Sequence, residues 1–275
     1  MSASPAEYSL PVRRPSFDLS EDLPRYWFRG EPFATHVFDA LSSVFPPGEA
    51  YFVRSVQRFQ DEIEDPALRK AIRAFAGQEG QHSHQHDRHV KLLLEQGYDS
   101  LAWRNDLVRR MSTWSIRRLP RFSLAGTAAL EHLTALLARQ LLSQPERWAE
   151  GMDPRMVPLW QWHALEEAEH KAVAYDVLQR VAPGYALRAT SLAMNTVGLF
   201  VEIMDRVVYM LWKDGLLFRR RVWADGLRFL FGRGGLLRGH GRDYWRWYRR
   251  DFHPNEVDDG ALITSCLKRI EAQLA

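Results

Sequence analysis

Apolar residues along most of this chain recur every three or four positions, which is the period of an α-helix with one buried face. Strands would show alternating runs rich in β-branched residues. The chain has few such runs and no Asn-Gly or Asp-Gly pair between two of them. Proline and glycine separate the periodic segments instead. The pattern therefore predicts an all-α protein.

The first two predicted helices flank a proline pair. We expect a short helix from about Pro32 to Val44, ended by Phe45-Pro46-Pro47-Gly48, because proline removes backbone hydrogen bonds. The next helix is expected to begin at Gly48-Glu49. It carries an apolar face made of Phe52, Val53, Val56, Phe59 and Ile63. Glu49 shares this face, where it either complements the helix dipole or belongs to a site.

A third helix is predicted from Asp65-Pro66, a good N-cap and first-turn pair, to Gln96-Gly97. Its inner face is apolar at both ends and polar in the middle: Leu68, Ile72, Phe75, Glu79, His82, His86, His89 and Leu93. Glu79 and His82 stand one turn apart on this face, which favours metal ligation. His86 and His89 are interpreted as supports behind a ligand or as a partly exposed face, with metal ligation as the alternative, and His84 points elsewhere.

Two more helices are expected at about 103–118 and 121–144. The inner positions of the second are small, which lets a neighbouring helix approach closely: Ala125, Ala128, Ala135 and Ala138. Glu131 is the one carboxylate among them. A surface salt bridge is the simpler interpretation of Glu131, but its alanine-rich flanks argue for an inward position.

The helix predicted from Asp153-Pro154 to Val181 carries the densest polar pattern. His163, Glu167 and His170 fall at i, i+4 and i+7, so all three project from one face. That face is otherwise apolar. Burying two imidazoles and a carboxylate there is costly unless something satisfies them, and a metal ion would do so.

From Tyr185 to Trp212 the chain predicts a long apolar helix interrupted by Glu202, Asp205 and Arg206. One of these three is expected to orient a ligand histidine or to bind a polar group of the substrate. A simple ion pair within the helix is the alternative.

Residues 213–251 hold 11 Lys and Arg against 4 Asp and Glu, with aromatic residues interleaved. Such a basic, aromatic segment is typical of a membrane-surface contact, and a homodimer interface or a lid over a hydrophobic substrate channel are alternatives. Nucleic acid is not expected as a partner, because the net charge is only +3 and no recognition fold accompanies the segment.

Length and composition set the remaining bounds. A chain of 275 residues with 46% hydrophobic and 26% charged residues can bury a large core. One cysteine excludes an intramolecular disulfide and fits a reducing compartment. No signal sequence or spanning segment is apparent, so a cytoplasmic location is expected, with peripheral membrane contact left open. We divide the chain into a flexible arm (1–23), a helical bundle (24–184) and a C-terminal extension packed on it (185–275).

The inward polar residues form one pattern. Four helices each contribute a glutamate, and two of these glutamates begin a Glu-x-x-His pair: Glu49, Glu79 with His82, Glu131, and Glu167 with His170. Four-helix bundles hold two carboxylate-bridged metal ions with this arrangement. Several anionic oxygens offset the charge of two close cations, and imidazoles suit iron, manganese or zinc.

The chain resembles the ferritin-like di-iron proteins, and more closely the predicted metal-dependent hydrolase family. The segments that carry the resemblance are Pro46-Pro47-Gly48-Glu49, Gln78-Glu79-x-x-His82-x-x-x-His86, Leu130-Glu131-His132, Trp162-His163-x-x-Glu166-Glu167-x-x-His170 and Phe252-His253-Pro254. It spans roughly residues 24–259. It implies a ferritin-like four-helix bundle with additional N- and C-terminal helices. No chemistry is assigned to His253.

The extra imidazole of His163 is similar to the seven-ligand pattern of di-iron arylamine N-oxygenases. This second resemblance implies Glu49, Glu79, His82, Glu131, His163, Glu167 and His170 as ligands of two metal ions, with His86, Glu202, Asp205 and Arg206 as candidate supports.

The function expected first is an oxygenase or oxidase. Two irons, or manganese and iron, would activate O₂, take electrons from a donor and oxidise an apolar or aromatic substrate. The alternative enzyme is a two-metal hydrolase of an ester, amide or phosphate, which would also work with zinc. A third interpretation is a non-enzymatic metal-containing sensing or binding protein.

Overall fold

The computed structural model describes residues 10–20 and 22–274, and helices form nearly all of its regular structure. The helices are α1 (Pro32–Gln57), α2 (Pro66–Glu95), α3 (Ser100–Arg118), α4 (Pro120–Ser143), α5 (Pro145–Ala149), α6 (Met156–His170), α7 (Val173–Val181), α8 (Tyr185–Lys213), α9 (Arg220–Phe231), α10 (Gly241–Arg246) and α11 (Gly260–Leu274), with 3-10 turns η1 (Gln60–Glu62) and η2 (Pro254–Glu256). The described ranges contain no strand, only an isolated bridge between Phe28 and Met152. The predicted all-α class is confirmed.

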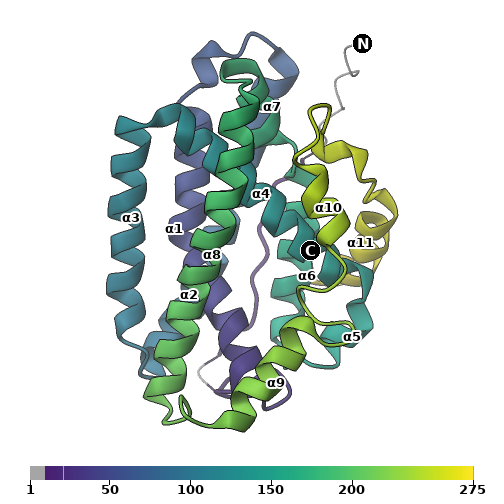
Figure 1. Cartoon of the computed structure of the whole chain (residues 1–275). Helices are drawn as coiled ribbons and strands as arrows, with labels where there is room; N and C mark the ends of the chain where they lie inside the picture. The colour runs from purple at the N-terminus through teal and green to yellow at the C-terminus, as the bar shows by residue number, and fades with distance from the viewer. Residues whose placement is uncertain (1–9, 21, 275) are drawn as a thin grey trace.

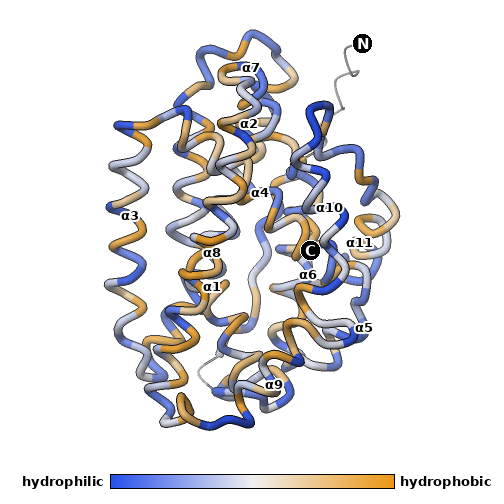
Figure 2. Tube along the Cα trace, in the orientation of Figure 1, coloured by the Kyte–Doolittle hydropathy of each residue, from blue (hydrophilic) through white to orange (hydrophobic). Residues whose placement is uncertain are grey.

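Four helical segments enclose the interior of the bundle. Helix α1 packs along α2 and against α4, α4 packs along α6 and α7, and α7 closes on α2. Helices α3 and α8 cover α1 and α4, and α8 runs across the front of the molecule in Figure 1. Helix α11 packs on α6 and α4, at the opposite edge of the molecule from α3 in Figure 1. In Figure 2 the segment around α10 is coloured mainly hydrophilic, whereas α9 carries hydrophobic stretches.

The apolar core consists of two clusters, and the polar motifs of α1, α2 and α4 lie between them. One cluster includes Leu41 of α1 and Leu93 of α2, and the other includes Phe52 of α1 and Phe75 of α2. The predicted ligands on these helices fall in the interval between the two clusters. The same holds on α4, where Ala128 and Ala138 belong to different clusters on either side of the polar position. The site is thus a polar layer sealed at both ends by apolar packing.

Helix α1 runs without a break from Pro32 to Gln57 and contains both Pro46 and Pro47. The prediction of two helices separated at residues 45–48 is therefore wrong. The fixed φ of proline is compatible with a helix, and packing of α1 against α2 along its length outweighs the lost backbone bonds. Glu49 consequently lies inside a helix, where the dipole of a first turn does not act on it.

The helix predicted from residue 154 to 181 is two helices. Helix α6 begins at Met156, and a turn at Lys171 and Ala172 separates it from α7. The Lys171 ammonium donates to the Val257 carbonyl at 2.6 Å and pairs with the Asp259 carboxylate. The C-terminal segment therefore holds the turn that follows His170.

The described part of the N-terminal arm lies against the bundle. Phe17 is buried with its ring centroid 5.4 Å from that of Trp162, and the Gln85 side chain donates to the Pro15 carbonyl at 2.7 Å. Residues 1–9 and 21 lie outside the described residues. Mobility of the arm and the boundaries at 24 and 185 remain predictions.

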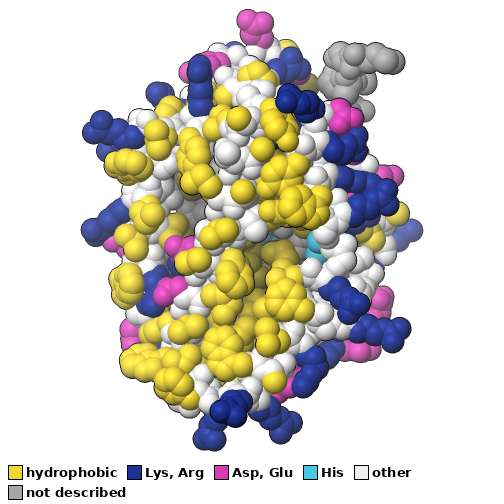
Figure 3. All heavy atoms as spheres, in the orientation of Figure 1, with side chains coloured by type: hydrophobic (Ala, Val, Ile, Leu, Met, Phe, Trp, Pro, Cys, Tyr) yellow, Lys and Arg dark blue, Asp and Glu magenta, His cyan; other side chains and the backbone are white. Residues whose placement is uncertain are grey.

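Helix α8 is apolar on two faces, only one of which is covered. Val207, Met210 and Leu211 are buried, but Val197 and Phe200 are 63% and 53% exposed. Figure 3 shows apolar side chains gathering over α3, α8 and α9, with basic side chains along the lower edge. Among the helices described, none has the length and apolar character to span a bilayer.

Candidate metal centre

Six of the seven predicted ligands form two adjacent groups. Glu49, His82 and His163 make one group, and their ligand atoms all lie within 4.8 Å of one another. The ligand atoms of the second group also all lie within 4.8 Å of one another. These side chains come from α1, α2 and α6, so the bundle brings together residues far apart in sequence.

The second group consists of Glu79, Glu167 and His170. Glu131 of α4 faces it, with its Oε2 3.4 Å from His170 Nε2. The structure thus gathers all seven residues in one layer of the bundle.

Glu79 and Glu167 belong to the second group but also face His82 of the first group. Glu79 Oε2 is 3.7 Å from His82 Nδ1, while its Oε1 is 3.2 Å from His170 Nε2. Glu167 Oε1 is 3.8 Å from His82 Nδ1 and 3.5 Å from His170 Nε2. Each of these two carboxylates therefore faces an imidazole of both groups and would contribute to holding an ion in either. Glu49 belongs to the first group and Glu131 faces the second.

His163 offers one ring nitrogen to the site and the other to the protein. Its Nε2 is 3.3 Å from Glu167 Oε1, whereas its Nδ1 is 2.9 Å from His86 Nε2. Its ring stacks on Phe45 and on His82, with centroids 4.4 and 4.3 Å away. Packing and hydrogen bonding therefore aim Nε2 at the carboxylates.

The donor atoms of the candidate ligands are buried, and most of them have no hydrogen-bond partner among the described residues. All seven residues are at most 4% exposed. Within the described part of the chain, no hydrogen bond reaches either carboxylate oxygen of Glu49, Glu79 or Glu131, nor Nε2 of His163 and of His170. Buried polar atoms in native proteins are nearly always satisfied. The set fits metal ions, which would satisfy all of these atoms at once.

The pKa shifts of the carboxyl groups also favour metal ions in this layer. Burial raises the pKa of Glu49 and of Glu131 well above the usual carboxyl range, and the nearby Glu79 raises both further. Burial would also raise the pKa of Glu167, but the adjacent His170 holds it well below its usual range. Four carboxylates in one buried layer cannot all ionise cheaply without cations.

Burial and neighbouring charges also shift the pKa values of the three imidazoles. Burial lowers the pKa of His82 and of His170, but Glu166 beside the first and Glu167 beside the second raise both above the usual value. Burial and the neighbouring His82 lower the pKa of His163 to about 4. Two divalent ions would neutralise four glutamates and leave the three imidazoles as neutral ligands.

Arg13 of the N-terminal arm supports the site from outside. Its guanidinium donates to both carboxylate oxygens of Glu169 at 2.8 Å and to Glu166 Oε1 at 3.0 Å. The other oxygen of Glu166 is 3.1 Å from His82 Nε2. A carboxylate behind a ligand histidine fixes the ring and its tautomer.

A second branch of this network reaches His170. Gln78 Nε2 donates to Glu169 Oε2 at 3.0 Å, and its Oε1 is 3.2 Å from His170 Nδ1. Gln78 and Glu166 stand inside the motifs, but the sequence does not link either to Arg13. Sequence reasoning missed Arg13 and Glu169, because their contacts join positions about 155 residues apart.

The other predicted supports divide into two classes. His86 contacts the candidate ligand His163, and both His86 and His89 are fully buried, so the interpretation of a partly exposed face is wrong. Arg206 pairs with Glu202 and hydrogen bonds Asn105 at 3.1 Å, and Asp205 pairs with Arg104. In the described structure these three residues of α8 make no hydrogen bond or ion pair with a ligand. They form a separate network between α8 and α3.

His253 has a structural contact rather than a place among the ligands. It caps the 3-10 turn η2, and its Nε2 lies 2.8 Å from Asp176 of α7.

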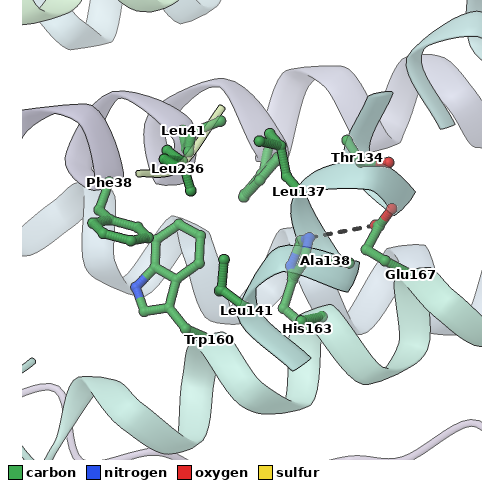
Figure 4. Close-up of a pocket in the computed structure, with 12 residues that line it drawn as sticks. Phe38, Leu41, Thr134, Leu137, Ala138, Leu141, Trp160, His163, Glu167 and Leu236 are labelled. Carbon is green, nitrogen blue, oxygen red and sulfur yellow. Dashed lines mark ion pairs between the residues drawn. The ribbon is translucent and has the colours of Figure 1, made fainter. Parts of the chain in front are cut away.

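A small cavity lies beside the candidate ligands and shares lining residues with two larger ones. It has a volume of about 30 Å³ and is lined by His163, Glu167, Thr134 and apolar side chains (Figure 4). This volume accommodates one or two water molecules. Phe45 and Thr134 also line a groove of about 840 Å³, whose wall includes Glu49.

The other neighbour of the small cavity is an apolar pocket of about 290 Å³. The two share Leu41, Leu137 and Leu236. The small cavity beside the candidate ligands is therefore flanked by a large groove and by an apolar pocket.

Fold and site together define a helical protein with two buried Glu/His groups that fit metal ions. Comparison with protein families agrees: residues 11–258 match the family of predicted metal-dependent hydrolases. The chain belongs to this family. No curated protein and no solved structure matches it significantly. The relation to ferritin-like proteins therefore remains a prediction.

Proposed function

We propose that this protein is a two-metal-dependent hydrolase of an apolar or aromatic ester or amide. The observation that carries the proposal is the pair of buried Glu/His groups beside a water-sized cavity and a large apolar groove. Membership of the predicted metal-dependent hydrolase family supports it. Two divalent ions held there would supply an activated water and polarise the scissile carbonyl.

The residues of the chain would position the water and the substrate and would exclude bulk water from the site. Glu167 and His163 line the small cavity, so a water there would lie beside a ligand carboxylate. Glu49 lies on the wall of the groove, where a substrate group would approach the first metal group. The apolar clusters on both sides exclude bulk water, which strengthens the electrostatic interactions within the layer.

The groove indicates the class of substrate. Its lining is mostly apolar, with Phe52, Met111, Trp114 and Leu199 from three helices. Met111 and Trp114 are each 60% exposed, which is unusual for side chains of this size. An aromatic or long aliphatic group would cover them. Phosphate esters fit less well, because one arginine, Arg110, is the single cation in the lining.

A second candidate is oxidation of the same kind of substrate with O₂ and an electron donor. It is favoured by the set of candidate ligands, since three imidazoles and four carboxylates between apolar clusters suit redox-active iron as well as zinc. Ring contacts reinforce this apolar character: Trp162 lies against His82 and Phe75 against His170. Iron and manganese–iron therefore remain candidates for the metal.

The experiment separates the two reactions by their requirements. Metal-free full-length protein is loaded with zinc or with iron and given p-nitrophenyl esters of short, long and aromatic acids. We expect zinc-loaded protein to hydrolyse the long or aromatic esters without O₂ or reductant, and Glu131→Gln to lose this activity. Turnover that requires iron, O₂ and a reductant, with none from zinc, would overturn hydrolysis and establish the second candidate.

A further inference from the structure

Large apolar side chains are exposed along the outer side of helix α3. Trp103, Leu107, Met111 and Trp114 stand at i, i+4, i+8 and i+11, so they form one row along the helix. All four are exposed, and both tryptophans are more than half exposed. The helix packs on α1 and α4. The row is therefore on the side of α3 that faces away from the bundle.

Helix α8 carries a second exposed row of apolar side chains at helical spacing: Met194, Val197, Val201, Val208 and Trp212. This helix also packs on α1 and α4, through its buried side. One carboxylate interrupts the exposed row, Asp205, and it pairs with Arg104 of α3. The row is therefore apolar along its length, with a neutralised charge in the middle.

The two rows belong to one face of the molecule. The Ser100 amide at the start of α3 donates to the Tyr209 hydroxyl of α8 at 3.1 Å. Further along, Met111 of α3 and Val201 of α8 line the same groove of about 840 Å³. Phe218, in the turn between α8 and α9, extends the face at one end (Figure 3). We call the two rows and Phe218 the apolar face.

Basic residues accompany the apolar face. Helix α3 holds five arginines and one aspartate, and residues 213–221 hold four lysines and arginines and one aspartate. Residues 219–221 directly follow Phe218, and all three are exposed arginines. The carboxylates in the middle of α8, Glu202 and Asp205, are paired with arginines. The surroundings of the apolar face are therefore positively charged.

We propose that the apolar face docks the protein on an anionic membrane surface. Large exposed apolar patches with a polar rim mark contact sites for proteins or membranes. Exposed tryptophan and phenylalanine rings are stable among lipid headgroups, and the arginines beside them would meet acidic headgroups. A second copy of this chain could also cover the face, but it would bring the same positive charge. Charge complementarity therefore favours the lipid surface.

Docking in this orientation would bring the substrate groove to the lipid. Met111, Trp114 and Val201 belong both to the apolar face and to the lining of the groove, and Glu49 lies in the wall of that groove. An apolar ester dissolved in the membrane would then enter the groove without crossing water. This consequence rests on the proposed function, whereas docking itself does not require the metal centre.

The experiment is flotation of the full-length protein, as purified, with vesicles of phosphatidylcholine, with and without phosphatidylserine. Wild type should bind the phosphatidylserine vesicles about tenfold more tightly than the neutral ones, because each arginine near an anionic surface adds to the affinity. High salt should remove most of this difference, since it screens exposed charges.

Two double variants test the two parts of the face. Trp103→Ser with Trp212→Ser removes apolar contact and should weaken binding to both kinds of vesicle about fivefold or more. Arg219→Glu with Arg220→Glu reverses charge and should weaken binding to phosphatidylserine vesicles about tenfold or more. All four side chains are exposed, so Tm should stay within about 2 °C of that of the wild type.

The matched control is Lys70→Glu with Arg73→Glu, which changes the net charge by the same amount. Both residues are exposed on α2, and α2 contributes no residue to the lining of the groove. This variant should bind within about twofold of wild type, since its charges lie away from the apolar face. A control that weakens binding as much as the Arg219 and Arg220 variant would overturn the assigned face.

Wild-type protein that floats with neither kind of vesicle would overturn the proposal, whether or not the variants fold. A dimer in sedimentation equilibrium without vesicles, dissociated by Trp212→Ser, would overturn it too, because the face would then belong to a second copy. Failure of the proposed function gives a different result: zinc-loaded protein would bind vesicles but hydrolyse no ester.

Discussion

Replacing Glu131 by glutamine should have opposite effects with and without metal. In the metal-free protein this residue is a buried carboxylate whose pKa is raised by burial and by Glu79. Glutamine keeps the shape and removes the charge. Because burying an ionisable carboxyl without a partner costs more than burying a neutral amide of the same shape, we expect Glu131→Gln to raise the free energy of unfolding by about 1–3 kcal/mol. At about 2–4 °C per kcal/mol, the metal-free Tm should rise by about 2–12 °C.

With zinc the sign should reverse, because the variant lacks a ligand. A hundredfold weaker affinity would remove about 2.7 kcal/mol of the stabilisation that zinc provides. The assay is thermal unfolding followed by circular dichroism, with and without excess zinc. Glu95→Gln on the exposed end of α2 is the control and should change either form by less than about 0.5 kcal/mol. A metal-free Glu131→Gln that is less stable than wild type, or zinc that stabilises both equally, would refute the reasoning.

The same shift predicts a pH dependence for the metal-free protein. A carboxyl whose pKa is raised on folding stabilises the fold fully below its unfolded pKa, and the contribution is lost as pH rises through the folded pKa. Since the pKa of Glu49 and of Glu131 are both raised, metal-free wild type should lose stability above about pH 4.3. Glu131→Gln should lose less, as measured by urea unfolding across this range. A pH profile identical to that of the wild type would contradict the shift.

Three further outcomes concern the surroundings of the site. Arg13→Ala should weaken zinc binding about 10–100-fold in a chelator competition, because Arg13 holds the carboxylate behind His82, and unchanged affinity would exclude that role. Trp114→Asp should raise the KM for a long-chain ester without altering metal content or Tm, whereas an unchanged KM would place the substrate elsewhere. Phe218, 90% exposed beside basic residues 219–221, should contribute to binding of anionic vesicles, so Phe218→Ser should weaken sedimentation with them, and wild-type protein that ignores such vesicles would contradict membrane contact.

Local spacing was sufficient to place two pairs of candidate donors each on one helix face. Glu79 and His82, like Glu167 and His170, are three positions apart, so any helix places them on one face. The helical periodicity of the flanking apolar residues then predicted that both faces point into the bundle. What the spacing could not provide was the distance between faces, which depends on how four helices pack.

Local rules failed where packing outweighed them. Proline usually ends a helix, yet Pro46 and Pro47 lie within α1, because α2 packs along the entire helix. The partner of His36 was also beyond sequence reasoning. His36 meets Asp214 178 positions later, and no local pattern links the two.

Metal content tests the central claim most directly. Elemental analysis of the purified full chain, grown with iron and zinc supplied, should find two metal ions per chain. Glu79→Ala should lose both, because this residue faces His82 and His170, while Glu49→Ala should retain about one. A wild-type chain that holds one ion or none under these conditions would contradict the dinuclear centre.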